Sequence, residues 1–255
     1  MNCIILAPGR RIPADDLVGS GSDGFIIRHG DNQVLKIPRL FGCSQGNGVI
    51  EADGDNHLHL DHLDLEKDIY ERLRGVPGIA NCIESNSDGI LLEYYRKGSL
   101  GDLISRSNHP PPSMAQRWKW VLQASDCVAR CHERRVLVFD IALRNFLLTD
   151  DLDLRMIDFA NSALLPVDAD LSKADVDGLT VKVDILHLAN VVYSILAWRE
   201  FSCRCEEEAE WPSLDRMPDV SGMDCGEVIR DCWLMRYVSV QELAFELRKC
   251  AAKVV

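Results

Sequence analysis

The sequence predicts an α+β protein of two lobes: a small lobe built on an antiparallel β-sheet with one main helix, and a larger, mainly helical lobe. Short strand-like runs and turn residues dominate the first part of the chain, with one helical pattern among them. Long helical patterns dominate the rest. We therefore expect a single bilobal domain over residues 1–255, with the small lobe at 1–93, a hinge at 94–98 and the large lobe at 99–255.

The small lobe begins with a predicted β-hairpin. Extended runs around Phe25–Ile27 and Val34–Ile37 flank HGDNQ, which has the composition of a turn. The Gly- and Asp-rich residues 41–56 are predicted to be a mobile loop, and a helical pattern starts at Asp61. Its apolar face comprises Leu63, Ile69, Tyr70 and Leu73. Two more strand-like runs, IANCIES and GILLEYY, follow around a turn at Asn86–Gly89.

The large lobe is predicted to contain two long helices and a small hairpin. Met114–Arg135 is an amphipathic helical pattern with Ser113 as its N-cap. VLVFD, NFLL and LRMIDF are short apolar runs typical of buried strands. The apolar run Val183–Trp198 is interrupted by Asp184 and falls short of the ~20 residues that span a bilayer. It predicts a helix buried inside the protein.

Charge and cysteine content narrow the range of partners. A formal net charge of −12 provides no general attraction for nucleic acid or an anionic membrane, so we expect neither as a partner. The start of the chain does not resemble a signal peptide, and we expect reduced thiols in the cytoplasm or nucleus.

The pairs Cys127/Cys131 and Cys203/Cys205 could ligate a metal, but a helical core face and a loop explain them better. A solvated loop likewise explains HLHLDH, His57–His62, better than a metal site does.

The stretch FDIALRNFLL brings an acid and an amide to the start of a predicted strand. NFLLTDDLDLRMIDF predicts a hairpin, and a turn at 150–153 would place Asn145 opposite Asp158, with Asp140 arriving at the same end. Carboxylate and amide oxygens are ligands that Mg²⁺ accepts, usually together with phosphate and water. A further carboxylate held off the metal can act as a base. The alternative without a catalytic role is that Asp140 and Asn145 only cap turns.

A second set of candidates lies in the small lobe. Gly19, Gly21 and Gly24 lie in GSGSDG, where glycines allow the backbone to approach a phosphate closely. A strand follows this stretch, which argues against a dinucleotide-binding fold, because that fold needs a helix there. Lys36 lies within an apolar strand and needs a partner, and Glu66 on the following helix is the expected one. A solvated strand face is the alternative for Lys36.

In their order along the chain, these motifs resemble those of eukaryotic protein kinases across nearly the whole sequence. GSGSDG resembles the glycine-rich loop, VLK the strand with the phosphate-binding lysine, and LEKDIY the helix whose glutamate pairs with that lysine. LEYY at 92–95 resembles the gatekeeper and hinge. FDIALRN resembles the catalytic loop and IDFA the Asp-Phe-Gly motif. Asp184 resembles the aspartate that opens the buried central helix and holds the catalytic loop.

The resemblance implies phosphoryl transfer from ATP with Mg²⁺ as cofactor. It implies that Asp140 is the base and that Asn145 and Asp158 hold the metal. It also implies that Lys36, held by Glu66, orients the phosphates. Arg144 would supply positive charge near the transferred group. The other implied nucleotide-binding residues are Leu17, Gly19, Gly21, Gly24, Ile26, Leu92, Glu93, Tyr95 and Leu147.

Several positions depart from the family pattern. Val138–Phe139 replaces the His-Arg that precedes the catalytic aspartate, so we expect activity that does not depend on a phosphorylated activation loop. Ala142 replaces the lysine usual in serine/threonine kinases, while Arg144 resembles the tyrosine-kinase arrangement. Ala160 replaces the last glycine of Asp-Phe-Gly. Residues 159–183 are short and acidic and lack Ala-Pro-Glu, which removes the usual floor for docking a peptide.

Three functions remain open from the sequence. The leading hypothesis is an ATP-dependent protein kinase that acts on serine or threonine rather than tyrosine. The second is a small-molecule kinase of similar fold, which the short segment 159–183 favours. The third is a pseudokinase that serves as a binding or scaffolding module. The acceptor is thus a hydroxyl of a protein or of a small molecule, and the oligomeric state is left open.

Overall fold

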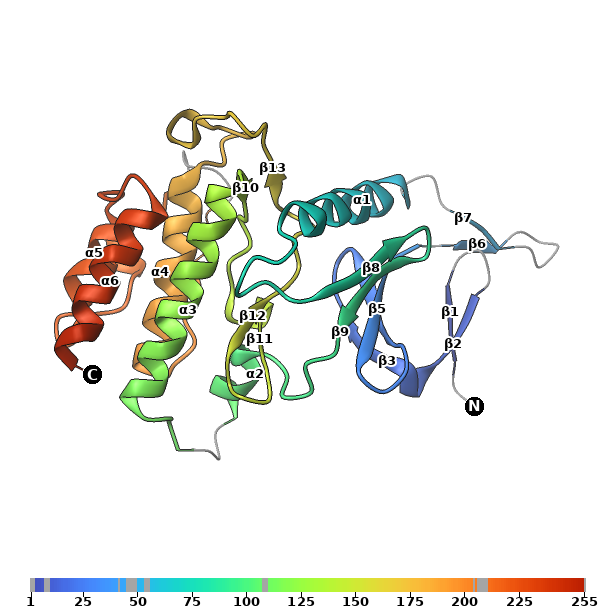
Figure 1. Cartoon of the computed structure of the whole chain (residues 1–255), viewed down its shortest axis with the longest axis horizontal. Coiled ribbons are helices and arrows are strands. Elements are labelled where there is room, and N and C mark those ends of the chain that lie inside the picture. The colour runs from blue at the N-terminus through green and yellow to red at the C-terminus, as the bar shows by residue number, and fades with distance from the viewer. Residues whose placement is uncertain are drawn as a thin grey trace. The chain divides into compact units, whose positions relative to one another are not determined.

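The computed structural model describes residues 3–6, 10–40, 42–44, 50–52, 56–106, 110–203, 205 and 211–254. They form two compact units, one made of Met1–Arg74 with Ala80–Tyr94 and the other of Gly75–Ile79 with Tyr95–Val255. The first unit is built on an antiparallel sheet and the second is mainly helical (Figure 1). The predicted α+β class is therefore confirmed.

The core of the first unit is a five-stranded sheet with the order β3-β4-β5-β9-β8. Its strands are β3 (Leu17–Ser20), β4 (Gly24–Arg28), β5 (Gln33–Pro38), β8 (Cys82–Asn86) and β9 (Gly89–Glu93). All neighbouring pairs are antiparallel, and the β4–β5 and β8–β9 hairpins lie where the sequence predicts them. One side of the sheet is closed by apolar side chains, among them Ile12, Ile27, Leu35 and Ile37. The central strand β5 is buried at four consecutive positions, Val34–Ile37, as expected for the middle of a sheet that is covered on both faces.

The first unit also contains two short strand pairs that are separate from this sheet. β1 (Cys3–Leu6) pairs with β2 (Arg10–Pro13), and β6 (Gly42–Ser44) pairs with β7 (Ile50–Ala52). The 3₁₀ turn η1 (Ala14–Asp16) links β2 to β3. The prediction of a loop over 41–56 is therefore wrong for the described residues 42–44 and 50–52. Strands of three residues are too short to show the alternation that identifies a strand in a sequence. The prediction is also wrong for Asn56, which begins a helix, and for 41, 45–49 and 53–55 it lies outside the described residues.

Helix α1 (Asn56–Arg72) packs against the sheet through β5 (Figure 1). It begins five residues before the predicted start at Asp61, because NHLHL contains neither glycine nor proline and continues the helix toward its N-terminus. His57–His62 therefore lies in a helix, and its prediction as a loop is wrong. The predicted apolar face is confirmed, since Leu63, Ile69, Tyr70 and Leu73 are all buried.

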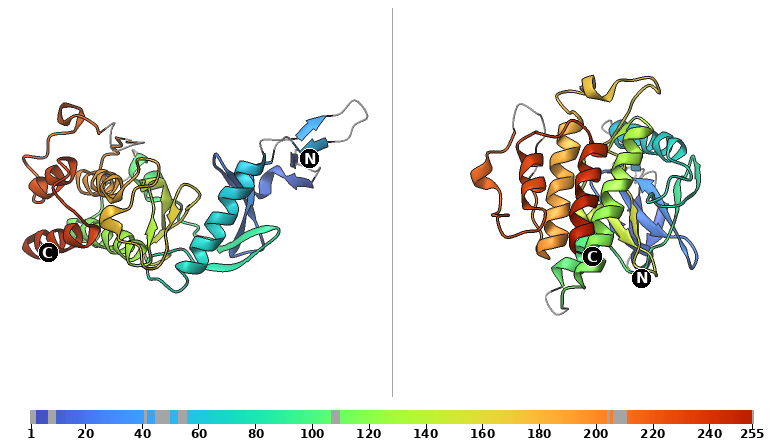
Figure 2. Two further views of the ribbon diagram at one scale, coloured as in Figure 1. Left: turned by 90° about the horizontal axis from the view of Figure 1, so that it is seen from above. Right: turned by 60° about the vertical axis from the view of Figure 1, so that its left-hand side comes forward.

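Five helices and two strand pairs make up the described second unit. The helices are α2 (Leu100–Ser105), α3 (Met114–Glu133), α4 (Val181–Ala197), α5 (Gly226–Trp233) and α6 (Val240–Val254). The strand pairs are β10 (Val136–Leu137) with β13 (Ala163–Leu164) and β11 (Phe146–Leu148) with β12 (Leu154–Met156). Single 3₁₀ turns occur at η2 (Leu143–Asn145), η3 (Leu171–Lys173) and η5 (Leu214–Arg216). Helix α3 packs against both α4 and α6, and these three helices run side by side in Figure 2.

The two helices predicted from long patterns are present. Ser113 caps α3 by accepting a hydrogen bond from the N–H of Gln116, as expected. Nearly every side chain of α4 is buried, which confirms the interpretation of that apolar run as an internal helix. Thr180 caps its N-terminus by accepting from the N–H of Lys182. Among the described residues, no helix is both long and apolar enough to cross a bilayer.

Candidate functional site

Lys36 and Glu66 form a buried ion pair in the first unit. Lys36 lies in β5 opposite Ile26 and Ile90, and its Nζ is 2.5 Å from Oε2 of Glu66 on α1. Only 9% of the lysine side chain and none of the glutamate side chain is exposed. A charge in this environment is tolerated when its partner is close, since an unpaired buried charge is strongly destabilising. The pairing expected from the sequence is therefore present.

The glycine stretch forms the turn between β3 and β4. The N–H of Gly21 donates to the carbonyl of Gly24 at 2.9 Å, which closes the turn. A side chain at Gly24 would place its Cβ 2.6 Å from the carbonyl oxygen of Ile37, so only glycine fits there. Arg39 supports the turn from outside, because its Nε donates to the carbonyl of Gly21 at 3.0 Å and its Nη2 to the hydroxyl of Ser20.

The remaining candidate nucleotide-binding residues fall in both units. Leu17, Gly19 and Ile26 lie on β3 and β4, where Gly19 pairs with Ile26. Leu92 and Glu93 end β9 in the first unit, while Tyr95 and Leu147 belong to the second. Their roles toward a nucleotide stay predictions.

Asp140, Arg144 and Asn145 come together in the second unit. Nη2 of Arg144 donates to both carboxylate oxygens of Asp140, each at 2.6 Å. Nδ2 of Asn145 donates to the carbonyl oxygen of Asp140 at 2.9 Å and to its Oδ2 at 3.1 Å. The 3₁₀ turn η2 is closed by a hydrogen bond from the N–H of Asn145 to the carbonyl of Ala142. This turn brings the side chains of Arg144 and Asn145 close to Asp140. A carboxylate, a cation and an amide are thus held as one cluster.

The loop that carries Asp140 is anchored by the buried carboxylate of Asp184, in the first turn of α4. Its oxygens accept hydrogen bonds from the N–H groups of Val138 at 2.9 Å and Phe139 at 2.6 Å. His132 of α3 places Nε2 2.7 Å from the same carboxylate. The role that the resemblance implied for Asp184, holding this loop, agrees with these hydrogen bonds.

Phe139 is held from its other side by His187, which no motif predicted. Nδ1 of His187 donates to the carbonyl of Phe139, and its Nε2 accepts from the N–H of Cys205 at 3.4 Å. One nitrogen donates and the other accepts, so this arrangement requires the neutral imidazole. The backbone of Phe139 is left-handed, with φ of 58°, a conformation that a bulky residue adopts only when its surroundings impose it. Asp184 and His187, three residues apart on one face of α4, impose it.

We expect Asp184→Asn to lower the free energy of unfolding by about 1–3 kcal/mol, because the amide presents an N–H₂ group to donors that now meet a carboxylate. Urea denaturation monitored by circular dichroism would measure the change. The matched control is Asp126→Asn, which removes an exposed ion pair with Arg248 and should change stability by less than about 1 kcal/mol. Equal effects at the two positions would contradict the anchoring role of Asp184.

The hairpin of β11 and β12 differs from the prediction by one residue. Phe146 pairs with Met156, so Asn145 lies opposite Ile157, whose N–H donates to the carbonyl of Asn145 at 2.9 Å. The predicted placement of Asn145 opposite Asp158 is wrong. Residues 150–152 form a three-residue loop in which Leu152 is left-handed, with φ of 61°, and such loops shift the register relative to a two-residue turn.

Asn145 and Asp158 supply donor atoms that suit Mg²⁺. The amide nitrogen of Asn145 is engaged with Asp140, which leaves its oxygen as the atom available to a metal. Asp158 follows directly on the residue bonded to Asn145 and is itself left-handed, with φ of 67°. One carboxylate and one amide oxygen fit Mg²⁺, which takes few protein ligands and completes its shell with phosphate and water.

The two cysteine pairs that were weighed as possible metal ligands lie in the core helix α3 and in a loop, as the preferred interpretation expected. Cys127, Cys131, Cys203 and Cys205 are free thiols and are buried. The neighbouring thiol of Cys127 and burial raise the pKa of Cys131 well above its ordinary value, which suits a core residue rather than a thiolate ligand. Within the part of the chain that the structure describes, no group of three or more His, Cys, Asp or Glu residues could hold a metal ion.

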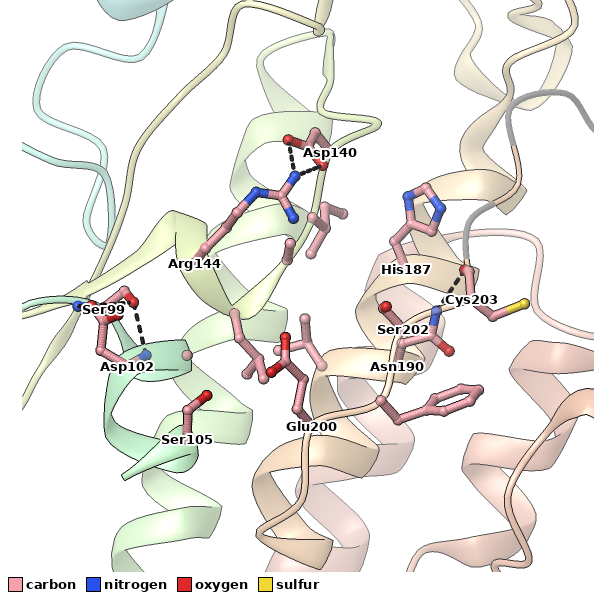
Figure 3. A pocket seen from close by; sticks show the side chains of 16 residues that line it. Ser99, Asp102, Ser105, Asp140, Arg144, His187, Asn190, Glu200, Ser202 and Cys203 are labelled. Carbon is pink, nitrogen blue, oxygen red and sulfur yellow. Dashed lines mark hydrogen bonds and ion pairs between the residues drawn. The ribbon is translucent and has the colours of Figure 1, made fainter. Parts of the chain in front are cut away.

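A cavity of about 260 Å³ opens beside Asp140 in the second unit. It is bounded by the loop from Asp140 to Arg144, by α2, by α4 and by residues 200–203 (Figure 3). Ser105 and Glu200 line it together with Asp140, and Figure 3 shows the Glu200 carboxylate between α2 and α4. The sequence offered no motif for Ser105 or Glu200, because the cavity arises from the packing of distant segments.

No protein-family model matches the chain. It is 24% identical over 163 residues to a leucine-rich repeat receptor-like protein kinase of Arabidopsis thaliana, which covers 62% of this chain and 14% of that protein. It is 36% identical over 159 residues to CBL-interacting serine/threonine-protein kinase 16 of the same plant, or 58% of this chain and 31% of that one. A third curated kinase, from Caenorhabditis elegans, is 28% identical over 44% of this chain and 15% of its own length.

The chain therefore spans less than a third of each of these relatives. Three kinases at modest identity support a protein kinase-like relationship for this chain, at the level of the family.

Proposed function

We propose that this protein is an ATP-dependent phosphotransferase that acts as a protein kinase, moving the γ-phosphoryl group of Mg-ATP to a serine or threonine hydroxyl. The observation that carries the proposal is the cluster of Asp140, Arg144 and Asn145, on a loop whose backbone is held by Asp184 and His187. The kinase relatives support a phosphotransferase, and two of the three are named as serine/threonine or S6 kinases.

In the proposed reaction Asp140 receives the proton of the acceptor hydroxyl. The acceptor oxygen forms its bond to the γ-phosphorus as the bond to the β,γ-bridging oxygen breaks, and ADP leaves. The carboxylate side chain is 24% exposed, so an acceptor can approach it. Arg144 is 51% exposed and keeps a fixed charge beside that carboxylate, where it can stabilise the transferred phosphoryl group.

The first unit would supply the groups that hold the triphosphate. Lys36, fixed by Glu66, presents a cation whose position is set by a buried partner. The glycine turn presents backbone N–H groups with no side chain at Gly19, Gly21 or Gly24 to block a phosphate. Asn145 and Asp158, which belong to the second unit, would hold Mg²⁺, which when bound neutralises charge on the phosphates.

A small-molecule acceptor is the second candidate. The cavity of about 260 Å³ beside Asp140 favours it, because an enclosed space of this size can hold a small compound. The segment 159–183 is short and leaves little surface for docking a peptide, which also favours a small-molecule acceptor. Both candidates use the same base and the same phosphate-binding residues.

One experiment separates them. The purified chain is incubated with Mg-ATP labelled at the γ-phosphate, a mixture of generic proteins and a metabolite extract, and acid-precipitable label is separated from soluble organic label. Label on serine or threonine in the precipitate supports the protein kinase. Label in a soluble metabolite supports the second candidate. Binding of ATP without transfer to either pool would overturn both and leave a pseudokinase.

A further inference from the structure

The glycine stretch contains an acid, Asp23, at a place where a triphosphate is proposed to bind. An exposed carboxylate among phosphate-binding N–H groups would repel the ligand. Asp23 is not left exposed, since only 13% of its side chain is accessible. Its Oδ1 is 2.7 Å from Nδ1 of His62 and 3.4 Å from Nδ1 of His59, and its Oδ2 accepts from the hydroxyl of Ser22.

Both histidines come from the helix that also holds Lys36. His59, His62 and Glu66 follow one another at intervals of three and four residues, so they share one face of α1. Glu66 of this face binds Lys36, and the two histidines bind Asp23 of the glycine turn. A single helical face therefore fixes two of the proposed phosphate-binding elements. All of these contacts lie within the first unit.

We propose that His59 and His62 are positioning residues for the nucleotide: they hold Asp23, fix the glycine turn and engage through hydrogen bonds a carboxylate that would otherwise repel the phosphates. The inference rests on the proposed binding of ATP by this turn. It assigns the histidines a role that neither a solvated loop nor a metal site would give them.

The charged groups around Asp23 agree with this role. Arg39 approaches the turn from the end of β5, where its own N–H donates to the carbonyl of Asp23 at 2.8 Å while its guanidinium lies over the ring of Phe25. Lys36 is close to Gly24 but is paired with Glu66. Within the described part of the chain, the Asp23 carboxylate therefore has three side-chain partners, which are Ser22, His59 and His62.

Protonation gives the contact a defined pH dependence. Burial raises the pKa of Asp23, but hydrogen bonds from Ser22 and His62 and the charge of His62 outweigh burial, so its pKa lies below the ordinary value. The lowered pKa means that Asp23 stabilises the fold fully above its unfolded-state pKa and that this stabilisation is lost as pH falls through the folded-state pKa.

The test is a mutant cycle read by isothermal titration calorimetry with Mg-ATP and, separately, with adenosine, which has no phosphate. We expect the double variant His59→Ala/His62→Ala to bind Mg-ATP about 3- to 10-fold more weakly and adenosine unchanged. Adding Asp23→Ala to the double variant should restore most of the affinity, because the repelling charge is gone. His57→Ala, an exposed histidine of the same helix, is the matched control and should behave as the wild type.

A loss of affinity that persists after Asp23→Ala would show a merely structural role and overturn the inference. So would wild-type affinity in the double variant. An absence of Mg-ATP binding by the wild type would instead overturn the proposed function, and the positioning role with it.

Discussion

Replacing Asp140 by alanine is expected to lower the rate of phosphoryl transfer by about 10²- to 10⁴-fold, the usual contribution of a general base. The affinity for Mg-ATP should change little, because the phosphate-binding residues proposed for the first unit are untouched. Stability should also change little. Of the two partners left behind, Arg144 has a half-exposed side chain that can be solvated, and Asn145 keeps its hydrogen bond to the carbonyl oxygen of residue 140. Turnover by label transfer, ATP affinity by calorimetry and unfolding by circular dichroism measure the three quantities.

The matched control for this change is Asp151→Ala. Asp151 is an exposed acid in the turn between β11 and β12, on the same hairpin that ends at Asn145. It has no part in the proposed chemistry, so its loss should leave turnover unchanged. Normal turnover in the Asp140 variant would refute the assignment of the base. A loss of turnover accompanied by an equal loss of ATP affinity would mean that Asp140 acts in binding instead.

The second large effect is expected at the buried ion pair. Lys36→Met removes the ammonium group that pairs with the fully buried carboxylate of Glu66, which should lower the free energy of unfolding by about 3–5 kcal/mol. It also removes the proposed phosphate ligand, so turnover should be lost. Chemical denaturation and label transfer measure the two effects on the same preparation.

A second variant separates stability from function at this pair. Lys36→Met/Glu66→Gln removes both charges and should recover much of the lost stability while remaining inactive. Lys249→Met is the surface control, since its pair with Glu246 is 54% and 31% exposed and should contribute about 0–1 kcal/mol. An active double variant would contradict the role of Lys36. A stable single variant would contradict the energetic importance of the pair.

The sequence predicts those parts of the site in which a polar residue interrupts an apolar pattern. The pairing of Lys36 with Glu66 could be inferred from the sequence alone, because a lysine within a buried strand needs a partner and the next helix offers an acid. The spacing of Asp140 and Asn145 on one short loop was equally informative. In both cases a local pattern carried the information.

Other features depend on backbone conformations or tertiary packing that no local pattern encodes. The hairpin register was wrong by one residue because Leu152 adopts a left-handed conformation without being glycine. His187 was visible in the sequence only as an interruption of an apolar helix, three residues after Asp184. The three-residue spacing of Asp184 and His187 was the signal in the sequence that both could contact the backbone of Phe139. Glu200 gave no such signal.

The replacement of the usual His-Arg by Val138–Phe139 has a structural counterpart. Both residues are buried, and their N–H groups are bound to Asp184. The loop is thus held through its backbone and through α4, with no guanidinium at position 139 to recruit a phosphate. Activity that is independent of phosphorylation on residues 159–183 therefore stays a prediction.

The most direct measurement of the central claim is the transfer of γ-phosphate label from Mg-ATP by the purified wild-type chain, with ATP binding followed in parallel by thermal shift. We predict label covalently bound to an acceptor, with none transferred when Mg²⁺ is chelated. A chain that binds Mg-ATP tightly while all label stays in ATP, with both protein and metabolite acceptors present, would contradict the proposed phosphotransferase activity.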